Sequence, residues 1–175
     1  MNLVLGFGPF VLFALLPRLS ADLALWTAFA AAFVVTIRDF IERPQLRVLD
    51  GVSLFLFGGL ALWRGFFDPG LSLAALRTIV DIGLTAAIAV SLARARPFSL
   101  QYAGRDGWSP AVFLRVNYVI SFVWLGAFAA MALGDAAVTF TGQPLYLGIG
   151  VSAVALAVAI VFTLRYPASV HRRQT

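Results

Sequence analysis

The sequence predicts an all-α protein, a polytopic membrane bundle of five to six transmembrane helices. Apolar residues make up 61% of the chain and charged residues only 12%, whereas soluble domains carry about 25% charged residues. The apolar residues are also gathered into six runs, separated by short segments rich in proline, glycine and arginine. These runs leave no room for a separate soluble domain, so we expect residues 1–175 to form a single transmembrane domain.

The six runs differ in how well their lengths match a membrane. They are Leu3–Leu16, Ala21–Ile37, Gly51–Trp63, Leu71–Ala93, Asn117–Leu133 and Leu145–Leu164. A membrane span needs about 20 residues, with a range of roughly 17–25, and the second, fourth, fifth and sixth runs fall within that range. The third run reaches it only if Val48–Leu49 and Gly65–Phe67 belong to the helix.

The first run is too short for an ordinary span. Its fourteen residues cover about 21 Å as a helix, against a hydrocarbon core of about 30 Å. Pro9 would bend the helix or delay its start. This segment either crosses the membrane or is re-entrant. The other prolines lie outside the runs, and Ser109-Pro110 has the pattern of an N-cap followed by a proline at the first helical position.

Arginine placement predicts the orientation. Ten arginines follow the second, fourth or sixth run, and only Arg18 and Arg64 lie in the opposite loops. Because arginine accumulates in cytoplasmic loops, segments 38–50 and 94–116 and the C-terminus are expected in the cytoplasm. The predicted location is the inner (cytoplasmic) membrane of a bacterium. Arginines beside hydrophobic spans bind lipid headgroups, so the net charge of +5 does not indicate nucleic acid.

Arg77 and Asp81 are charged residues inside the fourth run. Even on lenient insertion scales, an arginine or aspartate at the centre of a membrane helix costs about 2.5–3.5 kcal/mol. Their spacing of four residues places both side chains on one helix face, where they can neutralise each other. They form either a structural pair that fixes helix packing, or part of an ion or substrate path.

Segment 94–116 alternates arginines with aromatic residues. Such a segment either binds lipid headgroups or a protein partner, or is an ordinary cytoplasmic loop whose aromatic residues enter the interface. Segment 38–43, with charges of both signs, is expected to be a solvated helix end. The candidate docking residues of the longer segment are Arg94, Arg96, Phe98, Tyr102, Arg105, Trp108, Arg115 and Asn117.

Small residues indicate close helix packing. Gly148 and Ser152 have the spacing that lets membrane helices approach one another, as do the adjacent Gly58 and Gly59. We expect them to pack within the chain more often than to form a dimer.

Residue types that carry common chemistry are scarce. The chain has no cysteine, one histidine (His171, near the C-terminus) and one glutamate (Glu42). Thiolate, haem and zinc sites therefore lack donors, and no phosphate-binding or nucleophile-elbow motif is present. We expect no catalytic residues, no metal and no cofactor.

Three short motifs resemble the intracellular septation protein A family of bacterial inner-membrane proteins. Segment 7–13, Phe-Gly-Pro-Phe-Val-Leu-Phe, is similar to the opening of that family, and Arg96-Pro97-Phe98 to its basic-Pro-apolar element. Phe113, Asn117 and Trp124 look like the start of its penultimate helix. The chain departs from the family at Gly6 and Asp135, where an acid or amide and an asparagine would be expected. The resemblance implies envelope or septum maintenance through contacts with other membrane proteins.

Three functions remain open on the sequence. The first is a non-enzymatic membrane protein that acts through partner proteins or as a homo-oligomer, in contact with membrane lipids. The second, from a different class, is a small transporter or channel that uses Arg77 and Asp81. The third is an accessory subunit of a larger membrane complex.

Overall fold

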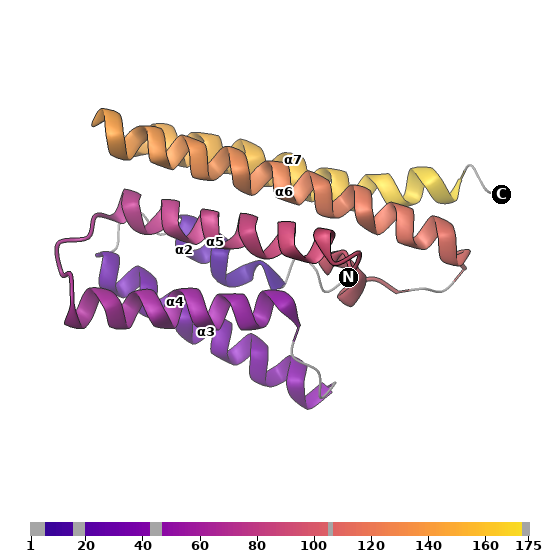
Figure 1. Cartoon of the computed structure of the whole chain (residues 1–175), viewed down its shortest axis with the longest axis horizontal. Coiled ribbons are helices and arrows are strands. Elements are labelled where there is room, and N and C mark those ends of the chain that lie inside the picture. The colour runs from indigo at the N-terminus through magenta and orange to yellow at the C-terminus, as the bar shows by residue number, and fades with distance from the viewer. Residues whose placement is uncertain (1–5, 16–19, 43–46, 105–106, 173–175) are drawn as a thin grey trace.

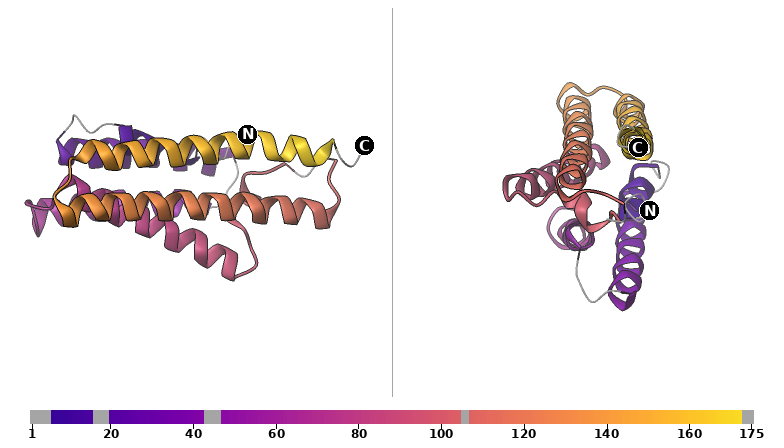
Figure 2. Two further views of the ribbon diagram at one scale, coloured as in Figure 1. Left: turned by 90° about the horizontal axis from the view of Figure 1, so that it is seen from above. Right: turned by 90° about the vertical axis from the view of Figure 1, so that its right-hand side faces the viewer.

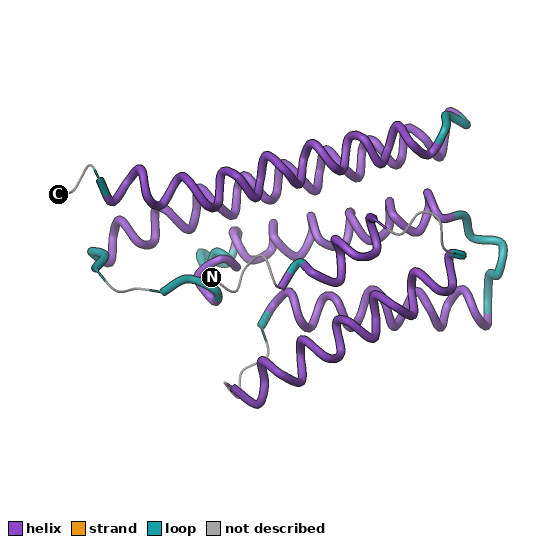
Figure 3. The backbone as a smooth tube through the Cα atoms, turned by 180° about the vertical axis from the view of Figure 1, so that it is seen from behind, coloured by secondary structure: helices purple, strands orange, loops and turns teal. Residues whose placement is uncertain are grey.

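The structure, a computed structural model, describes residues 6–15, 20–42, 47–104 and 107–172. Within these ranges all regular structure is helical and no strand occurs, which confirms the all-α prediction (Figure 3). Five helices, α3 to α7, are long and apolar enough to span a membrane. The helices are α2 (Gly8–Leu15), α3 (Ala21–Glu42), α4 (Val48–Phe66), α5 (Leu73–Ala93), the 3-10 helix η1 (Phe98–Gln101), α6 (Pro110–Thr141) and α7 (Leu145–His171).

Most helices extend beyond the apolar runs that predict them. Helix α4 includes the flanking residues Val48–Leu49 and Gly65–Phe66, which bring it to 19 residues, and Phe67 is its C-cap. Helix α6 begins at Pro110, as predicted, and continues to Gly142, whose φ of 67° ends it in the left-handed region that glycine favours. Hydropathy falls after Leu164, yet α7 continues to His171, so Pro167 lies inside a helix and not outside it. Hydropathy marks the lipid boundary, while the helices continue into the interface.

The long helices run alternately up and down the bundle (Figures 1 and 2). The end of α3, the segment between α5 and α6, and the end of α7 lie at one end of the molecule. This Arg-rich end carries Arg38, Arg47, Arg94, Arg96, Arg115, Arg165 and Arg172 among the described residues. The turns around Pro69 and Gly142 lie at the opposite end, where Arg64 Nε donates to Asp22 Oδ1 at 2.7 Å. The arginines that follow alternate apolar runs in the sequence therefore lie together at one end of the folded bundle.

Helix α2 fills the middle of the bundle with aromatic side chains. It packs against α3 and α7, so that contacts between neighbouring helices form a closed circuit from α2 through α7. Phe7, just before α2, stacks on Trp124 with ring centres 3.9 Å apart, and Phe10 and Phe13 both pack against Phe57. Phe7 also contacts Phe98 near the Arg-rich end.

The described part of the short first segment contains a helix of only eight residues, α2, which is not among the five helices long enough to span a membrane. Its N-terminal side lies near Phe98 through Phe7, and α3 begins at the end opposite to the Arg-rich one.

Large apolar side chains cover the outer faces of the long helices. Phe55, Ile41, Phe66, Leu133 and Phe140 are each more than 70% exposed. Exposure of this extent is unfavourable in water, where soluble monomers rarely show large contiguous apolar patches. The length and apolar surface of the helices support a membrane-spanning bundle.

Candidate functional site: a buried ionic cluster and an arginine-rich end

Arg77 and Asp81 project into the bundle from the first half of α5. Ser72 caps the helix by accepting a hydrogen bond from Ala75 N at 3.1 Å. With about 1.5 Å of rise per residue, Arg77 lies about 6 Å and Asp81 about 12 Å along the axis from Leu73. Both are buried, with exposed fractions of 3% and 4%. Both side chains therefore lie on the buried side of α5, and their spacing of four residues places them on one helix face.

The ion pair of Arg77 is formed with a different helix. Its Nε donates to Asp135 Oδ2 of α6 at 2.9 Å, and its Nη2 donates to Ser152 Oγ of α7 at 2.8 Å. Its Nη1 donates to the backbone oxygen of Ala14, at the end of α2, at 3.2 Å. The expectation that Arg77 and Asp81 neutralise each other within α5 is thereby corrected, since the guanidinium instead joins α2, α5, α6 and α7.

Asp81 and Asp135 lie beside each other at the centre of this cluster. Their carboxyl groups are within hydrogen-bond reach of one another. Asp81 Oδ2 and Asp135 Oδ1 are buried and have no hydrogen-bond donor among the described residues. A cavity of about 10 Å³, lined by Arg77, Asp81 and apolar side chains of α2, α5, α6 and α7, adjoins Asp81. A volume of this size holds about one water molecule.

The candidate docking residues fall into two groups at the Arg-rich end. Arg94, Arg96 and Arg115 are exposed and Trp108 is half-buried. Arg105 lies outside the described residues. Phe98, Tyr102 and Asn117 are buried, which corrects the expectation that their side chains are offered to a partner.

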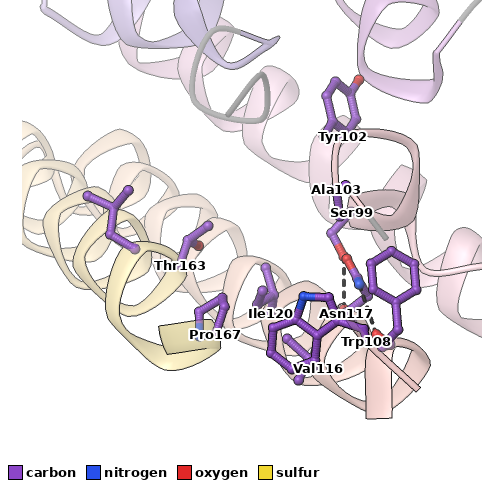
Figure 4. Close-up of a pocket in the computed structure, with 12 residues that line it drawn as sticks. Ser99, Tyr102, Ala103, Trp108, Val116, Asn117, Ile120, Thr163 and Pro167 are labelled. Carbon is purple, nitrogen blue, oxygen red and sulfur yellow. Dashed lines mark hydrogen bonds between the residues drawn. The ribbon is translucent and has the colours of Figure 1, made fainter. Parts of the chain in front are cut away.

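These buried residues attach segment 94–109 to the helices. Phe98 packs edge-on against Phe7, with ring centres 5.9 Å apart. Ser99 Oγ donates to Asn117 Oδ1 at 2.8 Å, and Asn117 Nδ2 donates to the backbone oxygen of Phe113 at 2.9 Å (Figure 4). Ser121 Oγ donates to Ser99 Oγ at 3.1 Å. These hydrogen bonds hold the segment on α6. Its first two arginines, Arg94 and Arg96, therefore extend from a part of the chain that is fixed in place.

A pocket of about 290 Å³ lies between this segment, α6 and α7 (Figure 4). Its wall combines apolar side chains such as Ile120 and Pro167 with the polar groups of Ser99, Asn117 and Thr163. The Trp108 ring, half-buried beside it, packs against His171 of α7 with ring centres 5.2 Å apart.

A second ionic cluster lies at the Arg-rich end, where α3 ends and α4 begins. Asp39, 3% exposed, accepts hydrogen bonds from Arg38 and from Arg47, and the Arg47 guanidinium lies 5.0 Å from the centre of the Tyr102 ring. Burial, together with the negative charge of Asp50, raises the pKa of the Tyr102 phenol, so this side chain stays neutral. Segment 38–43 is thus not simply a solvated helix end, because its aspartate is a core residue.

Sequence reasoning missed two members of the central cluster as site residues. Asp135 appeared only as a departure from the resembled family, since the fifth apolar run ends at Leu133. The signal that places it inside α6 is the next strong helix terminator, Gly142. Ser152 appeared only as a small packing residue. Among the described residues, no group of three or more histidine or acidic side chains could hold a metal.

No protein-family model, curated protein or solved structure matches this chain.

Proposed function

We propose that this chain is a non-enzymatic protein of the bacterial inner membrane that acts by binding other membrane proteins. Its role would be similar to envelope or septum maintenance, or to that of an accessory subunit in a larger membrane complex. The carrying observation is segment 94–109, whose exposed Arg94 and Arg96 are presented on a base of buried side chains. A preformed basic surface loses little conformational freedom when a partner or an anionic lipid headgroup binds.

The interior supports the same proposal. The donors of Arg77 are directed to Asp135, Ser152 and the Ala14 backbone oxygen, and the adjoining cavity holds about one water molecule. A solute larger than water has no space beside this cluster in the described conformation. Surface recognition therefore fits the geometry better than passage of an organic solute.

The test is native purification in a mild detergent with identification of co-purifying chains. Replacing Arg94 and Arg96 together with glutamine should weaken partner association in a salt-sensitive manner. The matched control replaces Arg165 and Arg172 with glutamine, which removes the same charge from the same end of the molecule. Equal weakening by both pairs, or unchanged association in the Arg94 and Arg96 variant, would reject a docking role for this segment.

A small transporter or channel is the alternative function. The observation that favours it is the pair of buried carboxylate oxygens without donors, Asp81 Oδ2 and Asp135 Oδ1, with Asp81 lining the cavity. Because the cavity is so small, its cargo would be an ion or water. Ion flux into proteoliposomes that contain the purified chain, and loss of this flux on Asp81→Asn, would favour this alternative over the partner-binding role.

A further inference from the structure

The carboxyl groups of Asp81 and Asp135 form an anionic site that the proposed partner-binding role does not use. Asp81 is 4% exposed and Asp135 is not exposed at all. They come from different helices, α5 and α6, and lie within hydrogen-bond reach of each other. Each carries one buried oxygen, Asp81 Oδ2 and Asp135 Oδ1, that no donor satisfies among the described residues.

The charges of the ionised side chains at this site do not balance. Two carboxylates and one guanidinium leave the cluster with one uncompensated negative charge. The Arg77 nitrogens donate to Asp135 Oδ2, Ser152 and Ala14, and none of these bonds reaches the two free oxygens. An uncompensated charge in an apolar interior costs several kcal/mol, so buried charges are normally paired.

Every element packed around the pair contributes either a neutral group or one of these charges. Arg77 is on α5 with Asp81, while α7 contributes the Ser152 hydroxyl and α2 the Ala14 backbone oxygen. The other cavity residues are apolar: Phe10, Phe13, Ala14, Val80, Phe128, Met131 and Leu156.

We propose that Asp81 and Asp135 bind one monovalent cation, a proton or Na⁺, between their carboxyl groups. The bound charge neutralises the cluster and gives the carboxyl pair the partner that no donor supplies. The adjoining cavity of about 10 Å³ leaves space for no more than about one water molecule, so the ligand is of ionic size. Oxygen donors suit a hard cation such as Na⁺, while two facing carboxyl oxygens are also bridged by a single proton.

The ligand would link the packing of α5 and α6 to the ion concentration. A proton bound only by the folded chain lowers stability as pH rises, by up to about tenfold in the folding equilibrium constant per pH unit. Bound Na⁺ instead raises stability by up to about tenfold for each tenfold increase in Na⁺.

Reversible unfolding in mixed detergent micelles tests the site, as a function of pH and of Na⁺ replaced by K⁺ at constant ionic strength. The expected result is a dependence on one of the two ions in the wild-type chain that Asp81→Asn abolishes, because the introduced amide donates to Asp135 without needing a cation. Asp68→Asn, a change at an exposed aspartate at the opposite end of the molecule, should keep the dependence. A wild-type chain insensitive to both ions, or an equal dependence in Asp81→Asn, would overturn the proposal.

If Asp81→Asn does not fold, infrared spectroscopy of the wild-type chain tests whether the carboxyl pair binds a proton or Na⁺. A carboxylic-acid carbonyl band at neutral pH identifies a proton, and a carboxylate band that moves with Na⁺ identifies sodium. A spectrum with neither feature would overturn the proposed cation site. Neither experiment depends on partner binding, so its failure would leave the proposed function untouched.

Discussion

Gly148 of α7 leaves open the space that the Asp135 carboxylate of α6 occupies. A Cβ atom at position 148 would overlap Asp135 Oδ1. The two helices meet here through a glycine and a carboxylate, and Ser152, one turn further along α7, receives the Arg77 hydrogen bond. The spacing of Gly148 and Ser152 thus serves packing within the chain, as the sequence suggests.

The first prediction is that Gly148→Ala destabilises the bundle. The added methyl group must displace the Asp135 carboxylate, and overpacking of this kind costs about 1–3 kcal/mol. Thermal unfolding in detergent measures the loss. Gly150→Ala is the matched control on the same helix, because an added Cβ there meets nothing within 4 Å. The control should be neutral or more stable, by at most about 1 kcal/mol of helix propensity. Equal stability of the two variants would contradict the contact.

The second prediction concerns the partner of Arg77. Removing one member of a buried ion pair costs about 3–5 kcal/mol, whereas apolar replacement of both is often close to neutral. Arg77→Met should therefore be strongly destabilising, and adding Asp135→Leu should recover most of the loss. A parallel double-mutant cycle of Arg77→Met with Asp81→Leu should show the smaller coupling energy, because Asp81 makes no ion pair with Arg77. A larger coupling energy for Arg77 with Asp81 than with Asp135 would show that Asp81 is the main partner of Arg77.

The sequence predicts helices well here because lipid imposes one constraint on every span. Each span must be apolar and about 20 residues long, so hydropathy locates α3, α5, α6 and α7 directly. The same signal stops at the edge of the hydrocarbon, however, and cannot show that α6 continues eight residues past Leu133. Asp135 falls in this extension, which is why the central ion pair cannot be read from composition.

Side-chain burial at the Arg-rich end is equally hidden from the sequence. An aromatic residue in a basic segment can enter the lipid interface or the protein core, and both environments suit it. Phe98 and Tyr102 enter the core because α2 places Phe7 against Phe98, and Arg47 of the α3–α4 connection stacks on Tyr102. These are contacts between distant parts of the chain, which a local pattern does not encode.

The third prediction tests the aromatic centre of the bundle. Phe7 is 1% exposed and stacks on Trp124, so Phe7→Ala leaves a cavity and should cost about 3–5 kcal/mol. Leu12→Ala is the control on the same short segment, since Leu12 is 40% exposed and faces outward. Unfolding measurements in detergent compare the two. A loss from Phe7→Ala no larger than that from Leu12→Ala would show that α2 is peripheral.

The fourth prediction concerns the attachment of segment 94–109. Asn117→Leu removes one of the two acceptors of Ser99 and the side-chain donor to Phe113, while Ser99 Oγ keeps the Asn117 backbone oxygen as its other acceptor. Each lost hydrogen bond contributes about 0.5–1.5 kcal/mol. Limited proteolysis should then cut segment 94–109 faster in the variant than in the wild-type chain. Ser109→Ala serves as control, because the Ser109 side chain makes no capping hydrogen bond. Unchanged cleavage in Asn117→Leu would mean that other contacts hold the segment.

The last prediction concerns orientation in the membrane. The Arg-rich end contains segment 94–109 and the end of α7, while Gly142 lies at the opposite end. Since arginine accumulates on the cytoplasmic side, reporter fusions after Gly104 and after Thr175 should both report cytoplasm. A fusion at Gly142 should report the outer side and serves as the internal control. Because the fold places segment 94–104 and the end of α7 at the same end, a split result between the first two fusions would contradict the bundle itself. A uniform reversal of all three would retain the bundle and reject the cytoplasmic assignment, and with it a docking surface for cytoplasmic partners.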